Sequence, residues 1–309
     1  MRTLAKALLP VVVLSAVVLA QAPAGLADRA RHEGTLTLYT SLAPTESKPL
    51  ADAFEKKYGV KVQLWRALSE EVVQRVITEA KAHRYSVDVV ETNGPEMEMI
   101  GREKLLNAAW TPDRLNLFVV GYNTAKVKRA DIPATYEGFT DPKWKGRIAL
   151  EATDSEWMAT LIKTTPQDKG MELMRKLAAL QPALRKGHVL LASLVAAGDV
   201  PVGLAMYNSN IETLKRKGAP IDYVPVQPVV ARPQGIGVAK HAPHPNAAQL
   251  FNDYVLSSEG QKLFESMGRT PANVKSESNS FRFTLIDPVT VLDESAKWEK
   301  VWNELFVRR

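Results

Sequence analysis

Apolar and polar positions change period repeatedly along the first third of the chain. Residues 36–40, 60–65 and 85–90 alternate or run apolar over strand length, and each is followed by a segment whose apolar residues have helical spacing. The β-α-β-α-β-α order implies a mostly parallel sheet, because parallel strands need a crossover connection. The pattern therefore predicts an α/β fold, with helices that begin near Ser69 and Pro95.

The rhythm changes at residues 115–122, a strand-like run that leads into a region with strands and helices of its own. In that region residues 202–206 predict a buried strand, and Ser209 stands three residues before Glu212, the spacing of a capping box. An extended, proline-rich segment at residues 224–234 then leads back, so that two extended crossings form a hinge. The predicted organisation is a signal peptide at 1–27, a first lobe from 28–117 plus 229–309, and an inserted second lobe at 118–228.

The first 27 residues have the pattern of a secretory signal peptide. Two basic residues precede an apolar run at residues 7–20, which is short for a membrane span, and small residues follow. Cleavage is expected after Ala22, Ala24 or Ala27. We therefore expect an exported protein.

Composition narrows the compartment and the partners. None of the 309 residues is a cysteine, which excludes a disulfide framework, thiolate metal sites, cysteine catalysis and a lipoprotein anchor. The formal net charge of +6 is spread along the chain without a basic cluster among aromatic residues, which argues against a nucleic-acid partner. A freely soluble, monomeric protein of the bacterial periplasm fits these features.

Five loops share one predicted geometry, because each leaves the carboxyl end of a strand and enters a helix. In open α/β sheets ligands bind at such junctions, and the free N–H groups of helix starts suit a carboxylate or phosphate. If the two lobes face each other, all five loops border one cleft. The candidate ligand-binding residues on these loops are Ser41, Arg66, Glu91, Asn93, Gly94, Asp154, Ser155, Tyr207 and Asn208.

These candidates also have structural interpretations. Tyr207 could ligate a metal, donate to an oxyanion or stack on a ring, or it could pack in the hinge; Tyr207→Phe is expected to weaken binding without changing the melting temperature of the ligand-free protein. Arg66 could clamp an anion or pair with Glu70 on the surface. Asp154 and Glu156 could bind a cation or an ammonium group, although acids in a first helical turn are expected for dipole reasons alone.

Enzymatic function has little support in the sequence. The chain has no G-x-S-x-G elbow and no H-E-x-x-H spacing, and His188, His241 and His244 are interpreted as structural residues. We expect a binding protein and no enzyme. An exported hydrolase or transferase on the same scaffold, or a solute-binding domain that feeds a sensor, are the alternatives.

Several segments resemble the periplasmic solute-binding proteins of ABC importers, specifically the ferric-iron-type group of the two-hinge class (type II). The resemblance implies a two-lobed α/β fold with mixed sheets flanked by helices, a two-stranded hinge, a ligand held between the lobes, and permease subunits of the inner membrane as partners. The matching segments, in order, are residues 36–41, 65–72, 88–96, 141–147, 217–220, 242–248 and 257–261.

The same resemblance bears on the ligand. Ferric-binding members typically hold iron with two adjacent tyrosines at a second-lobe junction, where this chain has Tyr207 followed by Asn208. The position that corresponds to the family's carboxylate is Asn93, with Glu91 close by. If the ligand is ferric iron, Tyr207 is the implied metal ligand, and the iron is cargo, since no cofactor is expected. Three ligands remain open: ferric iron with an anion, a small phosphorylated or carboxylated organic molecule, and a cationic amine.

Overall fold

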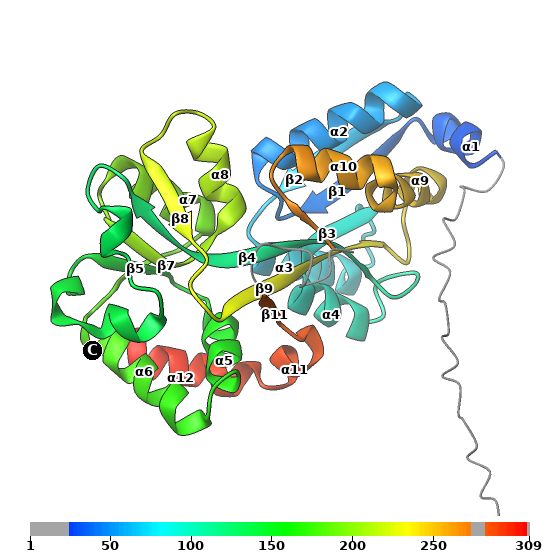
Figure 1. The fold of residues 1–309 in the computed structure, drawn as a ribbon. Helices are drawn as coiled ribbons and strands as arrows, with labels where there is room; N and C mark the ends of the chain where they lie inside the picture. Colours follow the sequence, from blue (N-terminus) through cyan, green and yellow to red (C-terminus); the bar gives the residue numbers. More distant parts are fainter. Residues whose placement is uncertain (1–24, 273–281, 308–309) are drawn as a thin grey trace, which may run out of the picture.

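The computed structural model describes residues 25–272 and 282–307, which fold into two α/β lobes side by side (Figure 1). The first lobe contains β1 (Thr35–Thr40), β2 (Lys61–Arg66), β3 (Val89–Asn93), α1 (Leu26–Glu33), α2 (Pro44–Tyr58), α3 (Ser69–Lys81), α4 (Gly94–Arg102), α9 (Pro245–Leu256) and α10 (Ser258–Ser266). The second contains β5 (Ile148–Glu151), β6 (Ala183–Arg185), β7 (Val202–Tyr207), β8 (Ile221–Val224), α5 (Ser155–Lys163), α6 (Gln167–Ala179), α7 (His188–Ala197) and α8 (Asn208–Lys215).

Two long strands, β4 (Thr111–Asn123) and β9 (Val229–Val238), run from one lobe into the other (Figure 1). They are antiparallel neighbours, and β9 also pairs with β3 while β4 also pairs with β7 and β8. The predicted crossing at 115–122 lies within β4, whereas the one at 224–234 lies in β9 only from Val229 onward. Their pairing joins the strands of both lobes into one path, β2-β1-β3-β9-β4-β7-β5-β6. The short strands β10 (Thr270–Pro271) and β11 (Phe283–Leu285) pair with β4 and β9.

The β-α rhythm of the first lobe is confirmed, since β1 pairs in parallel with both β2 and β3. The predicted bounds of the third strand are wrong, because the strand begins at Val89 and continues to Asn93. The reason is β9, which pairs with Glu91, Thr92 and Asn93 and draws these polar residues out of the expected loop.

Two predicted helix caps are also wrong. Helix α3 begins after Leu68, whose N–H is accepted by the Glu71 side chain at 3.1 Å, and so Ser69 lies inside the helix. Strand β7 stays extended through Tyr207, so α8 begins at Asn208 and Ser209 falls in the first turn instead of capping it.

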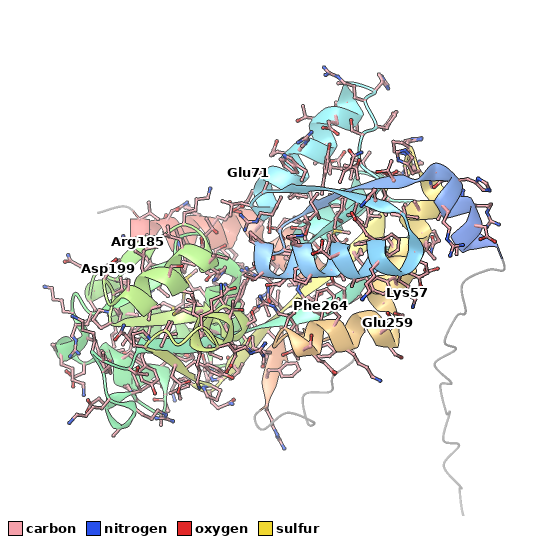
Figure 2. The ribbon with its side chains drawn as sticks, turned by 90° about the horizontal axis from the view of Figure 1, so that it is seen from above. Lys57, Glu71, Arg185, Asp199, Glu259 and Phe264 are labelled. Carbon is pink, nitrogen blue, oxygen red and sulfur yellow. The ribbon has the colours of Figure 1, made fainter. Side chains whose placement is uncertain are left out.

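Each lobe has its own core of buried side chains. In the first lobe α2, α9 and α10 pack together around Phe54, Phe251 and Phe264. Figure 2 shows Lys57 of α2 beside Glu259 of α10, an ion pair that ties two helices far apart in the sequence. Because each lobe buries its own apolar surface, the cleft side chains stand on two separately packed bodies.

The C-terminal helices contact both lobes. Helix α11 (Pro288–Asp293) packs on α4, while α12 (Ser295–Trp302) packs on α5 and continues into a final turn, η5 (Asn303–Val307). Trp298, Trp302 and Phe306 are buried in the second-lobe core. The lobe boundaries stay a prediction, and for residues 295–307 these contacts favour the second lobe over the first.

The N-terminal prediction falls mostly on residues 1–24, which lie outside the described residues. Helix α1 packs on α9, and its Leu26 is buried in the first-lobe core. In the part of the chain that the structure describes, every helix is too short or too polar to cross a bilayer.

Candidate functional site

A cleft of about 900 Å³ lies between the lobes, and residues of both lobes and both crossing strands line it. Three helices of each lobe begin at its wall, namely α2, α3 and α4 on one side and α5, α7 and α8 on the other. The N–H groups of these first turns are free of helical partners and carry the positive end of each helix dipole. The floor consists of side chains from the paired crossing strands: Arg114 and Asn116 from β4, Arg232 and Gln234 from β9.

The structure brings five of the nine predicted ligand-binding residues to the cleft. Ser41, Arg66, Asn93, Ser155 and Tyr207 line it. Glu91, Gly94, Asp154 and Asn208 lie outside the cleft lining and support its wall.

The three first-lobe residues are held by local contacts. The Ser41 hydroxyl accepts a hydrogen bond from Thr92 Oγ1 at 3.1 Å, and Asn93 Nδ2 donates to Ser69 Oγ at 2.7 Å. Arg66 is exposed at the end of β2, and its Nε donates to the Leu42 carbonyl oxygen at 3.3 Å. Among the described residues no carboxylate pairs with Arg66, so the expected alternative of a pair with Glu70 is not seen.

The residues behind the wall have structural roles. Glu91 is 1% exposed and accepts from Arg114 Nη1 at 2.6 Å and from the Thr40 hydroxyl. A Cβ on Gly94 would lie 2.9 Å from Pro288, so this glycine permits the close approach of α4 and α11. Asn208 is the first residue of α8, and Asn210 lines the cleft in its place.

Arg232 is the centre of a buried charge cluster in the second-lobe wall. Its guanidinium donates to the Tyr207 hydroxyl, pairs with Glu156, and donates to Asp154 Oδ1 at 3.0 Å. The Arg232 side chain is 6% exposed and that of Asp154 is 1% exposed, so water screens these charges poorly. The Arg232 guanidinium therefore lies beside the Tyr207 oxygen. A metal ion bound by this oxygen would need the same position.

His188 belongs to the same cluster, and its interpretation as a purely structural residue missed this. The imidazole stacks on the Tyr207 ring with 3.7 Å between centroids, and Nε2 lies 3.2 Å from Asp154 Oδ1. His188 begins α7 and lines the cleft. By contrast, His244 contacts Asp88 and His241 stacks on Tyr85, which supports their structural interpretation.

Burial and neighbouring charges set the acidity of this cluster. Burial raises the pKa of Glu156 to about 8, although Arg232 lowers it, and the charges of Glu96 and Asp154 raise it further. Burial also raises the pKa of the Tyr207 phenol, so the phenol keeps its proton at neutral pH. Burial alone would lower the pKa of Arg232, but Glu156, Tyr207 and Asp154 raise it well above its usual value.

A second buried cluster surrounds Arg114 on the other crossing strand. Arg114 Nη1 lies 2.6 Å from Glu91 and 3.0 Å from Asp113, and Arg269 pairs with Glu46 close by. Burial raises the pKa of Asp113 to about 7, with Arg114 lowering it and Glu91 raising it. Burial lowers the pKa of Arg269 to about 9.

Sequence reasoning missed the two crossing arginines, although a signal was present. Arg114 and Arg232 each stand beside or within an apolar, strand-forming run, and a charged residue in a buried strand must be paired. Glu96 escaped attention because an acid in a first helical turn is expected anyway. The sixth junction, Lys186 to His188, escaped because β6 is only three residues long.

One group of oxygen and nitrogen donors could hold a cation. Glu151, Asp154 and His188 each offer one ligand atom, and these three atoms lie within 4.8 Å of one another. Both Glu151 oxygens are already engaged, because they accept from Thr153 N at 2.5 Å and from Gly187 N at 2.8 Å. Arg232 beside Asp154 opposes a further positive charge there.

Comparisons with known proteins agree with this geometry. Residues 69–284 match the family described as "Bacterial extracellular solute-binding protein". The "Fe(3+)-binding periplasmic protein" of Serratia marcescens is 24% identical over 275 residues, 78% of this chain and 79% of that protein.

Two solved structures have the same fold. Iron-bound HitA from Pseudomonas aeruginosa has a TM-score of 0.71 at 22% identity and covers 88% of this chain and 99% of its own. AfuA from Actinobacillus pleuropneumoniae, with exogenous fructose-6-phosphate bound, has a TM-score of 0.71 at 22% identity and covers 89% and 99%.

These matches confirm the predicted fold class, a mixed α/β periplasmic binding fold of type II, and the expected family. They also confirm the expectation of a non-enzymatic protein, because the family binds solutes rather than transforming them. The chain belongs to the bacterial extracellular solute-binding proteins, of the type that includes the periplasmic ferric-iron-binding proteins.

Proposed function

We propose that this protein is exported through a signal peptide to the periplasm, binds a small organic anion between its lobes, and delivers it to the permease of an ABC importer. Family membership supports the binding and transport role. The permease partner is implied by family membership alone, and we propose a monomer on the basis of the sequence.

The observation that carries the ligand class is the cleft itself. A volume of about 900 Å³ is within the range of sites for organic molecules and far larger than a single metal ion needs. Its lining mixes apolar side chains, among them Leu68, Met99, Leu190, Leu292 and Trp298, with the polar starts of six helices. Such a site suits an organic molecule with an anionic group.

Two cationic side chains, one on each lobe, are positioned to bind that anionic group. Arg66 and Lys186 line the cleft, both are exposed, and neither has an ion-pair partner among the described residues. An arginine can bind a carboxylate or phosphate through two parallel hydrogen bonds. The AfuA structure, with its bound sugar phosphate, supports the capacity of this fold to hold an organic anion.

The test is a thermal-shift screen with organic carboxylates, organic phosphates and ferric citrate, followed by titration calorimetry. A ligand at a hundred times its Kd stabilises the fold by about 2.7 kcal/mol, which raises the melting temperature by roughly 4–5 °C for a chain of this size. Arg66→Gln should weaken binding about tenfold or more, whereas Arg175→Gln, an exposed arginine on α6, is the matched control and should not.

Ferric iron is the second candidate, and the cluster of Glu151, Asp154 and His188 beside Tyr207 is the observation that favours it. Iron bound through Tyr207 would give a tyrosinate-to-iron charge-transfer band in the visible spectrum. A colourless protein that responds to organic anions alone would exclude iron, whereas a coloured protein that responds to ferric citrate and to no iron-free anion would overturn the organic-anion proposal.

A further inference from the structure

The floor of the cleft and the adjoining wall hold more buried carboxyl groups than guanidinium groups. Among the described residues in the two buried clusters and the adjoining wall there are three guanidinium groups, those of Arg114, Arg232 and Arg269. The carboxylates there number seven: Glu46, Glu91, Glu96, Asp113, Glu151, Asp154 and Glu156.

Three of these carboxyl groups have one buried oxygen that accepts no hydrogen bond from the described residues. Glu96 Oε2, Asp113 Oδ1 and Asp154 Oδ2 are buried and accept no hydrogen bond within the described part of the chain. Asp113 and Asp154 are 0% and 1% exposed. The other oxygen of each group does accept a hydrogen bond, but a buried oxygen without a donor is costly, so these three oxygens favour a proton or a cation.

The surplus is concentrated where the lobes face each other. Glu96 lies in the first turn of α4 of the first lobe and Glu156 in the first turn of α5 of the second, and both line the cleft. The charge of Arg232 lowers the pKa of both carboxyl groups, and Arg232 also pairs with Asp154. Three carboxyl groups share the Arg232 guanidinium, and so a positive group of a ligand that lies between Glu96 and Glu156 would take the place of the proton that burial keeps on Glu156.

Away from the floor the cleft lining holds the cations Arg66 and Lys186 as well as the exposed acids Glu70 and Glu299. Arg66 and Lys186 line the cleft without ion-pair partners among residues 25–272 and 282–307, and helix starts surround them. The cleft is therefore polarised, with a region suited to an anion and a floor suited to a cation.

We propose that the ligand is a zwitterion, an organic anion that also carries an ammonium or similar cationic group, and that Glu96 and Glu156 select it by binding that group. This inference rests on the proposed function, since it takes the cleft to be an organic-anion site. Burial that raises the pKa of Glu156 to about 8 fits a carboxyl that holds a proton until a ligand cation replaces it.

The experiment compares matched ligands that differ only in the amino group. The panel consists of organic carboxylates and phosphates with and without an amine, such as 4-aminobutanoate with butanoate and phosphoethanolamine with ethyl phosphate, measured by thermal shift and calorimetry at neutral pH. The aminated member of the pair that binds best should bind at least about tenfold more tightly, which corresponds to about 1.4 kcal/mol.

Variants then assign the preference to the two carboxylates. Glu96→Gln and Glu156→Gln should each reduce the ratio of the affinity for the aminated member to that for the amine-free member about tenfold. Glu103→Gln is the matched control, because Glu103 is exposed just after the end of α4 and away from the cleft lining. If Glu156→Gln does not fold, the wild-type comparison and Glu96→Gln decide the matter.

The outcomes separate the two proposals. Equal or tighter binding of amine-free anions overturns the zwitterion inference and leaves the organic-anion function standing. A preference for amines that survives both substitutions also overturns it. Binding of no member of any pair overturns the proposed function and this inference together.

Discussion

Tyr207 lines the cleft and its hydroxyl forms a buried hydrogen bond, and of these two features the sequence predicted only the first. The sequence places it at a strand–helix junction, and it does line the cleft, stacked on His188. Its hydroxyl, however, accepts a hydrogen bond from the buried guanidinium of Arg232. The residue therefore stabilises the fold as well as forming the ligand-binding wall.

This contact changes the expectation for Tyr207→Phe. Loss of the hydroxyl leaves a buried, charged donor without its acceptor, which costs about 1–3 kcal/mol, so the melting temperature of the ligand-free protein should fall by several degrees. Calorimetric melting checks this. The exposed Tyr85 offers a matched control, and an unchanged melting temperature for Tyr207→Phe would contradict the buried hydrogen bond.

Glu156 gives a prediction about pH. Burial raises its pKa from 4.5 to about 8, and it faces Arg232, Glu96 and Asp154. Between these two values the folded chain holds a proton that the unfolded chain has released, so this group's contribution to stability is largest below pH 4.5 and is lost as the pH rises toward 8.

Glu156→Gln should remove that dependence, since glutamine does not titrate. Relative to the wild type, the variant should be more stable at pH 8 than at pH 5, by a difference on the order of 2 kcal/mol. Denaturant unfolding at the two pH values measures it. A difference of the opposite sign would show that the Arg232 pair, rather than burial, dominates at Glu156.

At the scale of elements, the sequence predicted the strands and helices well wherever local pattern decides them. Residues 36–40 and 202–206 lie in strands β1 and β7, and Gly59 ends α2 in the left-handed conformation that glycine favours. The failures are at Glu91, which lies in a strand, and at Ser209, which does not cap its helix. Both depend on tertiary pairing of β3 and β7 that no local pattern contains.

The sequence also predicted the candidate site where local pattern decides it, and failed where tertiary pairing decides it. Strand–helix junctions can be read from the sequence, and the five predicted loops do border the cleft. Which side chain of a junction points inward depends on register, so Asp154 and Asn208 lie behind the wall. Arg232 and Glu96 meet only because β9 and α4 adjoin in space.

The C-terminal segment supplies a prediction at this scale. Trp302 is 2% exposed, packs in the second-lobe core and donates to the Ala152 carbonyl oxygen at 2.8 Å. Trp302→Ala should destabilise the protein by about 3–5 kcal/mol and speed hydrogen exchange in α5 more than in α9. Faster exchange confined to first-lobe helices would show that residues 295–307 belong to the first lobe.

At the scale of the whole molecule, two separately packed lobes meet over crossing strands that carry the buried arginines. Arg114 binds carboxylates of the first lobe and Arg232 binds those of the second, while Glu96 of the first lobe also raises the pKa of Arg232 through its charge. A change in the angle between the lobes would therefore change the contacts of Glu96 in particular. The ligand site and the hinge share these residues, which is a natural way to couple binding to closure.

The central claim is that the cargo is an organic anion. Native mass spectrometry of the protein purified from its own periplasm tests this most directly, with fragmentation of any retained ligand and a visible absorption spectrum of the same sample. We expect a colourless protein that carries a small organic acid, with an amino group if the zwitterion inference holds. A coloured protein whose mass exceeds that of the chain by one iron atom would contradict the claim.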